Sequence, residues 1–110
     1  MSFRTTGQGQ KGAAMASNHL LNRRVVLRGG IEVGRVVDVI LEADADRPLG
    51  LDVLCGDGEH RFLPMAAVAN VAADVEIDSA LTLLETAELE FYRAHGRSLR
   101  GGASGTLADR

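Results

Sequence analysis

The side chains best suited to metal binding or nucleophilic chemistry are three histidines and one cysteine: His19, His60, His95 and Cys55. No two of them have the short Cys-x-x-Cys or His-x-x-x-His spacing that places paired ligands around one metal ion. Asp44 and Asp46 form a closer acidic pair, but this stretch lacks the further oxygen ligands of a calcium-binding loop. The sequence therefore predicts neither a metal site nor a bound cofactor.

The same side chains have simple structural roles. Cys55 falls on the apolar side of an alternating stretch, which predicts a small core residue whose thiol stays protonated. His60 follows Asp57 at a turn, where charged side chains are normally solvated. Gly30 and Gly34 have neither the Lys-Ser/Thr of a phosphate-binding loop nor the strand-to-helix context of a dinucleotide fingerprint. We therefore expect no catalytic residue and a protein that is not an enzyme.

Length and composition predict one small domain. A chain of 110 residues buries roughly 60–65% of its unfolded surface. Its 4% aromatic content, without Trp, requires an aliphatic core. No basic segment followed by an apolar segment stands at the start, which predicts a cytoplasmic protein. The apolar runs are far shorter than the ~20 residues of a spanning helix, so we expect no direct membrane insertion.

The charge is unevenly distributed along the chain. The net charge is −3, but residues 31–84 carry eleven carboxylates against three arginines and so stand at −8. A surface of that sign repels phosphate backbones, so nucleic acid is not the expected partner. The alternative is a local basic patch formed by Arg23, Arg24 and Arg28 on the first strand.

Several short apolar segments separated by turn residues predict antiparallel strands. Gly29 and Gly30 can supply the positive φ of the first turn, and a β-branched residue at Gly34 should destabilise the fold if Gly34 also holds a positive φ. Asp38 interrupts the second strand and must face water or find backbone donors. Pro64 must end its strand or lie at an edge. The segments are residues 24–27, 35–43, 48–55 and 61–65, followed by shorter ones near residue 71 and within 75–84.

The clearest alternation spans residues 48–55. One face carries Leu49, Leu51, Val53 and Cys55, and the other carries Pro48, Gly50, Asp52 and Leu54. Tight turns without intervening helices favour a small closed or partly open barrel over a sheet with crossover helices. The predicted fold class is therefore mainly β, with five to six short antiparallel strands in one small barrel.

A helix is predicted over residues 86–96, with Thr86 as its cap and Gly96 at its end. One face of this helix carries Ala87, Phe91 and either Ala94 or His95. Phe91, with Tyr92 beside it, is the candidate side chain for closing one end of the barrel or for contacting a partner. We expect the closing role, because short isolated helices are marginal in water.

The predicted organisation is a disordered tail over residues 1–17, a barrel over 18–85, the helix over 86–96 and a disordered tail over 97–110. Both tails are rich in Gly and polar residues and show no apolar periodicity. Met15 is an alternative translation start.

The middle of the chain resembles the PRC-barrel domain family, including its stand-alone bacterial members. A Gly turn leads into a strand with a Gly-x-Val-x-Asp-Val pattern, and a Leu-Pro pair follows later; the matching residues are Gly29, Gly30, Gly34, Val36, Asp38, Val39 and Pro64. The family adopts a small SH3-like barrel and occurs in the photosynthetic reaction-centre H subunit and in a ribosome maturation factor. The resemblance thus implies a non-catalytic module that binds another protein through its barrel surface.

The resemblance leaves the partner open. An accessory role in ribosome or ribonucleoprotein assembly is the alternative, because an acidic barrel suits basic ribosomal proteins. Small barrels also leave strand edges that must be covered. We therefore expect a weak homodimer through an exposed strand edge, as the resemblance to stand-alone family members also suggests.

Overall fold

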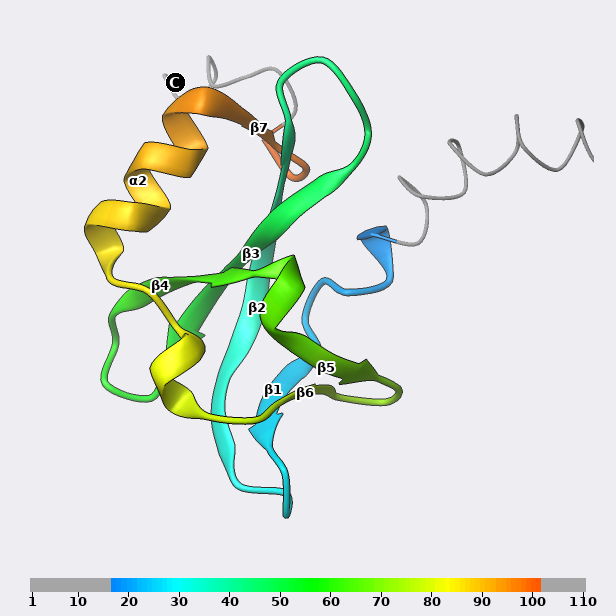
Figure 1. The fold of residues 1–110 in the computed structure, drawn as a ribbon, viewed down its shortest axis with the longest axis vertical. Coiled ribbons are helices and arrows are strands. Elements are labelled where there is room, and N and C mark those ends of the chain that lie inside the picture. Colours follow the sequence, from blue (N-terminus) through cyan, green and yellow to red (C-terminus); the bar gives the residue numbers. More distant parts are fainter. Residues whose placement is uncertain (1–16, 102–110) are drawn as a thin grey trace, which may run out of the picture.

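A computed structural model describes residues 17–101, which form a curled β-sheet with a helix along one side (Figure 1). The sheet has the order β4-β3-β2-β1-β6-β5, and β7 pairs with the last residues of β2. The predicted fold class, a mainly β small barrel with a C-terminal helix, is confirmed; the sheet is a half-barrel. In chain order the elements are β1 (Arg24–Leu27), β2 (Glu32–Glu42), β3 (Pro48–Cys55), β4 (His60–Pro64), η1 (Met65–Ala67), β5 (Val68–Val71), β6 (Val75–Ile77), η2 (Ala80–Thr82), α2 (Thr86–His95) and β7 (Gly96–Ser98).

The sheet differs from the prediction in two details. Within residues 17–101 it has seven strands rather than five or six, and β1 pairs with β6 in parallel, with Val25 opposite Val75. A parallel pair needs a long connection, and here the intervening strands curl the sheet until β6 returns beside β1 (Figure 1). Pairing between segments so far apart leaves no local sequence pattern.

The prediction of disorder from residue 97 is wrong for the described part of that segment. β7 pairs antiparallel with residues 40–42 of β2, and the Leu99 N–H donates to the Val39 carbonyl at 2.8 Å. The sequence Gly-Arg-Ser of β7 has no apolar alternation, so nothing in it predicts a strand. Its order comes from backbone hydrogen bonds to a stretch of β2 that β1 does not reach.

Parts of both predicted tails lie outside the described residues. Residues 1–16, which include Met15, and residues 102–110 lie outside the described residues, so those parts of the predicted tails stay predictions. Ser17, the last residue of the predicted N-terminal tail, is buried. Of the helices in residues 17–101, none has the length and apolar character needed to cross a membrane.

The inner face of the sheet carries an aliphatic core, as the composition predicts. Its fully buried side chains are Val25, Val36, Val39, Leu41, Leu51, Val53, Leu63, Val75 and Ile77. Cys55 belongs to this cluster, with its thiol 3.8 Å from the Val53 carbonyl oxygen, which confirms the predicted core placement. Leu49 does not share that face and packs in a second cluster beneath α2.

The glycines of the first hairpin serve two different purposes. Gly29 and Gly30 have φ angles of 99° and 94° and form the turn between β1 and β2, as predicted. Gly34 lies within β2 and does not hold a positive φ. It is required for close packing instead, because a Cβ there would lie 2.7 Å from both the Leu54 carbonyl oxygen and a Val53 methyl carbon.

Gly34→Ala should therefore destabilise the protein by about 1–3 kcal/mol through overpacking between β2 and β3. Gly56→Ala is the matched control, since a Cβ at Gly56 meets nothing within 4 Å, and it should change stability by no more than ~0.5 kcal/mol. Urea unfolding curves measure both free energies. Equal midpoints for the two variants would contradict the close approach of the strands.

Candidate interaction surface

α2 packs against the outer face of β2, β3 and β4 through two of its side chains. Leu89 is fully buried in a cluster with Ile40 and Phe62. The Tyr92 ring stacks on the Phe62 ring with their centroids 4.3 Å apart and their planes within 6°. Buried aromatic pairs add to the free energy gained from surface burial. The sequence predicts that Thr86 caps the helix, but its hydroxyl instead donates to the His60 carbonyl at 2.7 Å.

Asp52 is a buried carboxylate beneath this helix. Its side chain is 3% exposed and accepts hydrogen bonds from Arg93 of α2 at one oxygen and from the His60 ring at the other, the latter at 2.8 Å. An ionised carboxylate without such partners is strongly destabilising in a protein interior. The pairing therefore fixes both the position and the rotation of α2 on the sheet.

Asp38 is the cross-strand neighbour of Asp52, and it is buried as well. Its carboxylate accepts hydrogen bonds from the Val39 N–H at 2.8 Å, from the Arg100 N–H at 3.0 Å and from the Ser98 hydroxyl. Asp38 thus finds the backbone donors that the sequence requires. Two like charges directly opposite each other on adjacent strands destabilise a sheet unless each has a hydrogen-bond partner. The segment from α2 to residue 100 supplies donors to both Asp38 and Asp52.

The sequence predicts that His60 lies on a solvated turn, and this prediction is wrong. His60 begins β4 and contacts Asp52. Asp57 does lie on that turn, where Arg61 donates two hydrogen bonds to its carboxylate. These bonds, with a further one from the Glu59 N–H at 3.0 Å, lower the pKa of Asp57 to about 2. The turn between β3 and β4 is therefore held by a carboxylate that stays ionised in mild acid.

Phe91 does not close the barrel, and that prediction is wrong. Its side chain is 53% exposed and contacts Tyr92 edge-on and His95 at a centroid distance of 4.2 Å. The helix carries two apolar faces, and the sequence alone does not say which is buried. Arg93 must reach Asp52, so the side of α2 next to Arg93 faces the sheet. Leu89 and Tyr92 lie on that side and are therefore packed against the sheet. Of the two predicted candidates, Tyr92 packs on the barrel and Phe91 faces solvent.

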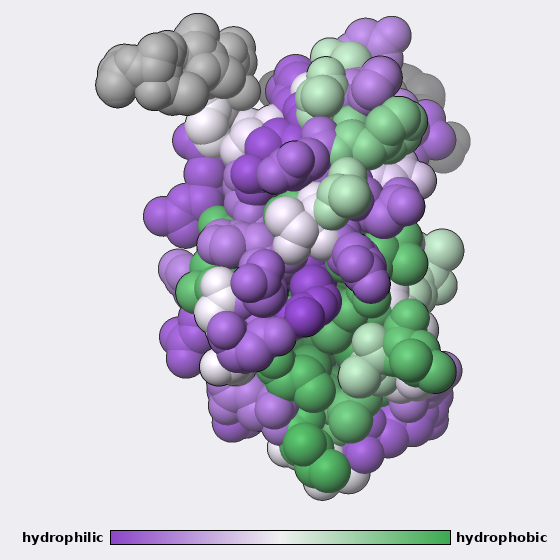
Figure 2. All heavy atoms as spheres, turned by 90° about the vertical axis from the view of Figure 1, so that its left-hand side faces the viewer, coloured by the Kyte–Doolittle hydropathy of each residue, from purple (hydrophilic) through white to green (hydrophobic). Residues whose placement is uncertain are grey.

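A separate apolar area lies below α2. Figure 2 shows hydrophobic side chains gathering over the lower half of this side, where Figure 1 places η2 and the β1–β2 hairpin. The most exposed large apolar residues are Leu81 of η2, at 89%, and Ile31 of the hairpin, at 64%. Val33 and the exposed Leu54 line a shallow groove between β2 and β3. We call Ile31, Val33, Leu54 and Leu81 the lower apolar surface.

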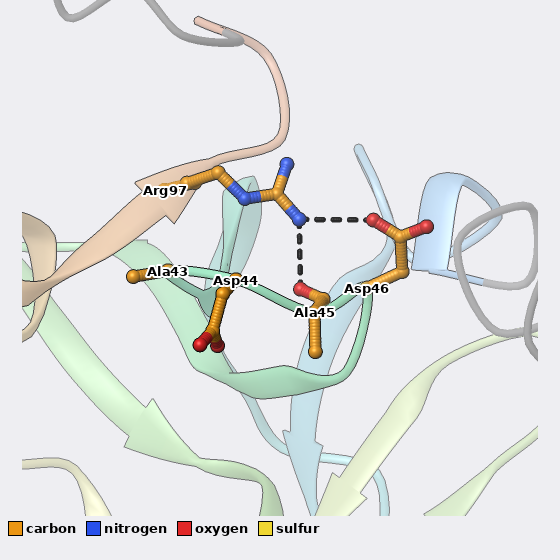
Figure 3. Close-up of a pocket in the computed structure, with 5 residues that line it drawn as sticks. All are labelled: Ala43, Asp44, Ala45, Asp46 and Arg97. Atoms are coloured by element: carbon orange, nitrogen blue, oxygen red, sulfur yellow. Dashed lines mark hydrogen bonds and ion pairs between the residues drawn. The ribbon is translucent and has the colours of Figure 1, made fainter.

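A polar hollow at the opposite end lies between β7 and the β2–β3 loop (Figure 3). There Arg97 donates to the Ala45 carbonyl at 2.7 Å and to the Asp46 carboxylate at 2.9 Å. Asp46 is thus engaged by Arg97. In the part of the chain that the structure describes, no three His, Cys, Asp or Glu side chains gather as metal ligands.

The remaining motif residues support the fold. Val36 and Val39 are fully buried in the inner core. Pro64 ends β4 and leads into η1. The site residues that sequence reasoning missed are Asp52 and Arg93. The available signal was an aspartate inside an apolar strand, where this residue is rare unless a partner satisfies it.

Comparison with known proteins places the chain in a family without naming a partner. A family model described as the PRC-barrel domain matches residues 13–84, well over half of the chain. The PRC barrel is in general a non-catalytic fold. A search of curated proteins finds no match.

Arg93→Met should destabilise the protein by about 1–3 kcal/mol, because it leaves the buried Asp52 with His60 as its one side-chain partner. Arg28→Met is the matched control, since Arg28 pairs with Asp78 on the surface, where the two side chains are 66% and 62% exposed, and its loss should leave the midpoint nearly unchanged. Thermal unfolding followed by circular dichroism compares the two. An equal midpoint for Arg93→Met and wild type would show that the pair does not hold α2.

Proposed function

Because this chain belongs to the PRC-barrel domain family, we propose that it is a non-catalytic module that binds another protein through its barrel surface. The observation that carries the proposal is the lower apolar surface, where Leu81 is 89% exposed and Ile31 is 64% exposed. Burying such a side chain is worth about 1.5–3 kcal/mol. Contiguous exposed apolar surface on a small domain is typical of interaction sites.

η2 holds Leu81 in a defined position. The Leu81 N–H donates to the Ser79 hydroxyl at 3.0 Å, and the Thr82 hydroxyl donates to the Ser79 carbonyl at 2.7 Å. These bonds fix the turn from which the leucine projects. A turn whose backbone is already fixed loses little backbone entropy on binding, which favours its leucine as an anchor for a complementary pocket.

The arginines of β1 and its flanks support a protein partner over nucleic acid. Arg24 donates two hydrogen bonds to Asp74, and Arg28 pairs with Asp78. Arg23 donates to the carbonyls of Ala72 and Ala73. Each of the three arginines that could form a basic patch is therefore already engaged within the protein, which leaves little positive charge for phosphates.

The test compares captured partners of wild type and single-site variants by affinity purification with mass spectrometry, followed by titration with the purified partner. Leu81→Asp should weaken binding at least tenfold, because it replaces the most exposed large apolar side chain of this surface with a charge. Val71→Asp is the control, since Val71 is an exposed apolar residue on β5, away from the lower apolar surface.

A partner that binds Leu81→Asp and wild type equally well would rule out this surface. The assembly role expected as the alternative has its own measurement, which is co-sedimentation of the protein with ribosomes. Ribosome binding that survives Leu81→Asp would favour that alternative over the proposal.

A further inference from the structure

The outer face of α2 carries an apolar stripe that no residue of the described chain covers. Ala87, Phe91 and Ala94 are all exposed and follow one another at spacings of four and three residues. That spacing places them on one side of a helix. A helix whose opposite side is already packed has no need of a second apolar stripe for folding. The stripe is therefore available to bind a second molecule.

The charges beside the stripe are complementary to those of a second, antiparallel copy. Glu88 and Glu90 lie before Phe91 in the helix and His95 lies after it, whereas Arg93 turns inward to Asp52 and takes no part in the contact. In an antiparallel pair whose two-fold axis passes beside Phe91, Glu88 of one copy lies opposite Ala94 of the other. His95 is the next residue, so it lies close to Glu88. A parallel pair would instead bring like charges together. When His95 is protonated, this pairing of opposite charges beside an apolar seam favours the antiparallel orientation.

The shape of the stripe also suits a helix pair. Phe91 lies near the middle of α2, and the alanines on both sides of it leave room for the ring of a second copy. Small residues allow helix axes to approach to about 8–10 Å. The charge balance favours α2 as well, since residues 86–95 hold two glutamates and one arginine, whereas residues 31–84 stand at −8. Two copies repel each other less through α2 than through the acidic barrel.

We propose that α2 is a homodimer interface in which two copies pack antiparallel through Ala87, Phe91 and Ala94. A ten-residue helix spans about 15 Å, so the contact falls below the ~1,200 Å² of standard interfaces and the dimer is weak and concentration-dependent. The lower apolar surface stays open in both copies. The dimer would thus present two binding surfaces at once, which raises avidity for a clustered or repeated partner.

Sedimentation velocity across a concentration series of the full chain tests the interface. Wild type should shift from monomer to dimer as the concentration rises. Phe91→Ala should weaken dimerisation at least tenfold, and its melting temperature should match that of wild type at a concentration where wild type is monomeric, because Phe91 contributes to the contact and not to the core. Glu88→Lys should also weaken the dimer, and Glu88→Lys combined with His95→Glu should restore it.

The competing account is pairing through a strand edge, such as that of β5, which pairs with β6 on one side alone. Val71→Lys, at an exposed position of β5, should leave dimerisation unchanged under the α2 proposal. A wild type that stays monomeric throughout the series overturns the proposal. So does a dimer that is lost in Val71→Lys and kept in Phe91→Ala. So does a Phe91→Ala variant that unfolds at a lower temperature than wild type at a concentration where wild type is monomeric.

Discussion

Two buried carboxylates on adjacent strands set the position of everything after η2. Asp38 and Asp52 are cross-strand neighbours, and neither can be buried as an ion without donors. The strands themselves do not supply enough of them. Arg93 from α2 reaches Asp52, and Ser98 with the Arg100 N–H reaches Asp38. The C-terminal segment is therefore a necessary part of the barrel, because it neutralises or hydrogen-bonds two charges that the sheet alone would leave unsatisfied.

This constraint determines which surfaces are free. Once Arg93 must reach Asp52, Leu89 and Tyr92 turn toward the sheet and Phe91 turns away from it. The helix covers the upper part of the outer face and leaves the lower apolar surface open (Figure 2). A single electrostatic requirement thus separates two areas of exposed apolar residues. One lies on the barrel and suits another protein, and one lies on the helix and suits a second copy.

The local features of this fold could be read from the sequence, and the long-range ones could not. Gly29 and Gly30 predicted the first turn, and the alternation around Cys55 predicted a core strand, because both depend on neighbouring residues. The burial of Asp52 depends on Arg93, which is far away in the chain and gives no local signal. β7 is a strand through backbone pairing alone. The face of α2 that is buried depends on the same distant contact, so Phe91 was assigned to the wrong side.

The central claim is that α2 docks with Tyr92 inward and Phe91 outward. A NOESY spectrum of isotope-labelled protein at low concentration tests it directly, and the chain's single tyrosine makes the assignment simple. We predict strong cross-peaks between the rings of Tyr92 and Phe62, whose centroids lie 4.3 Å apart, and cross-peaks from the Phe91 ring to Tyr92 and His95. Cross-peaks from Phe91 to Ile40 and Phe62, without those of Tyr92 to Phe62, would contradict the account.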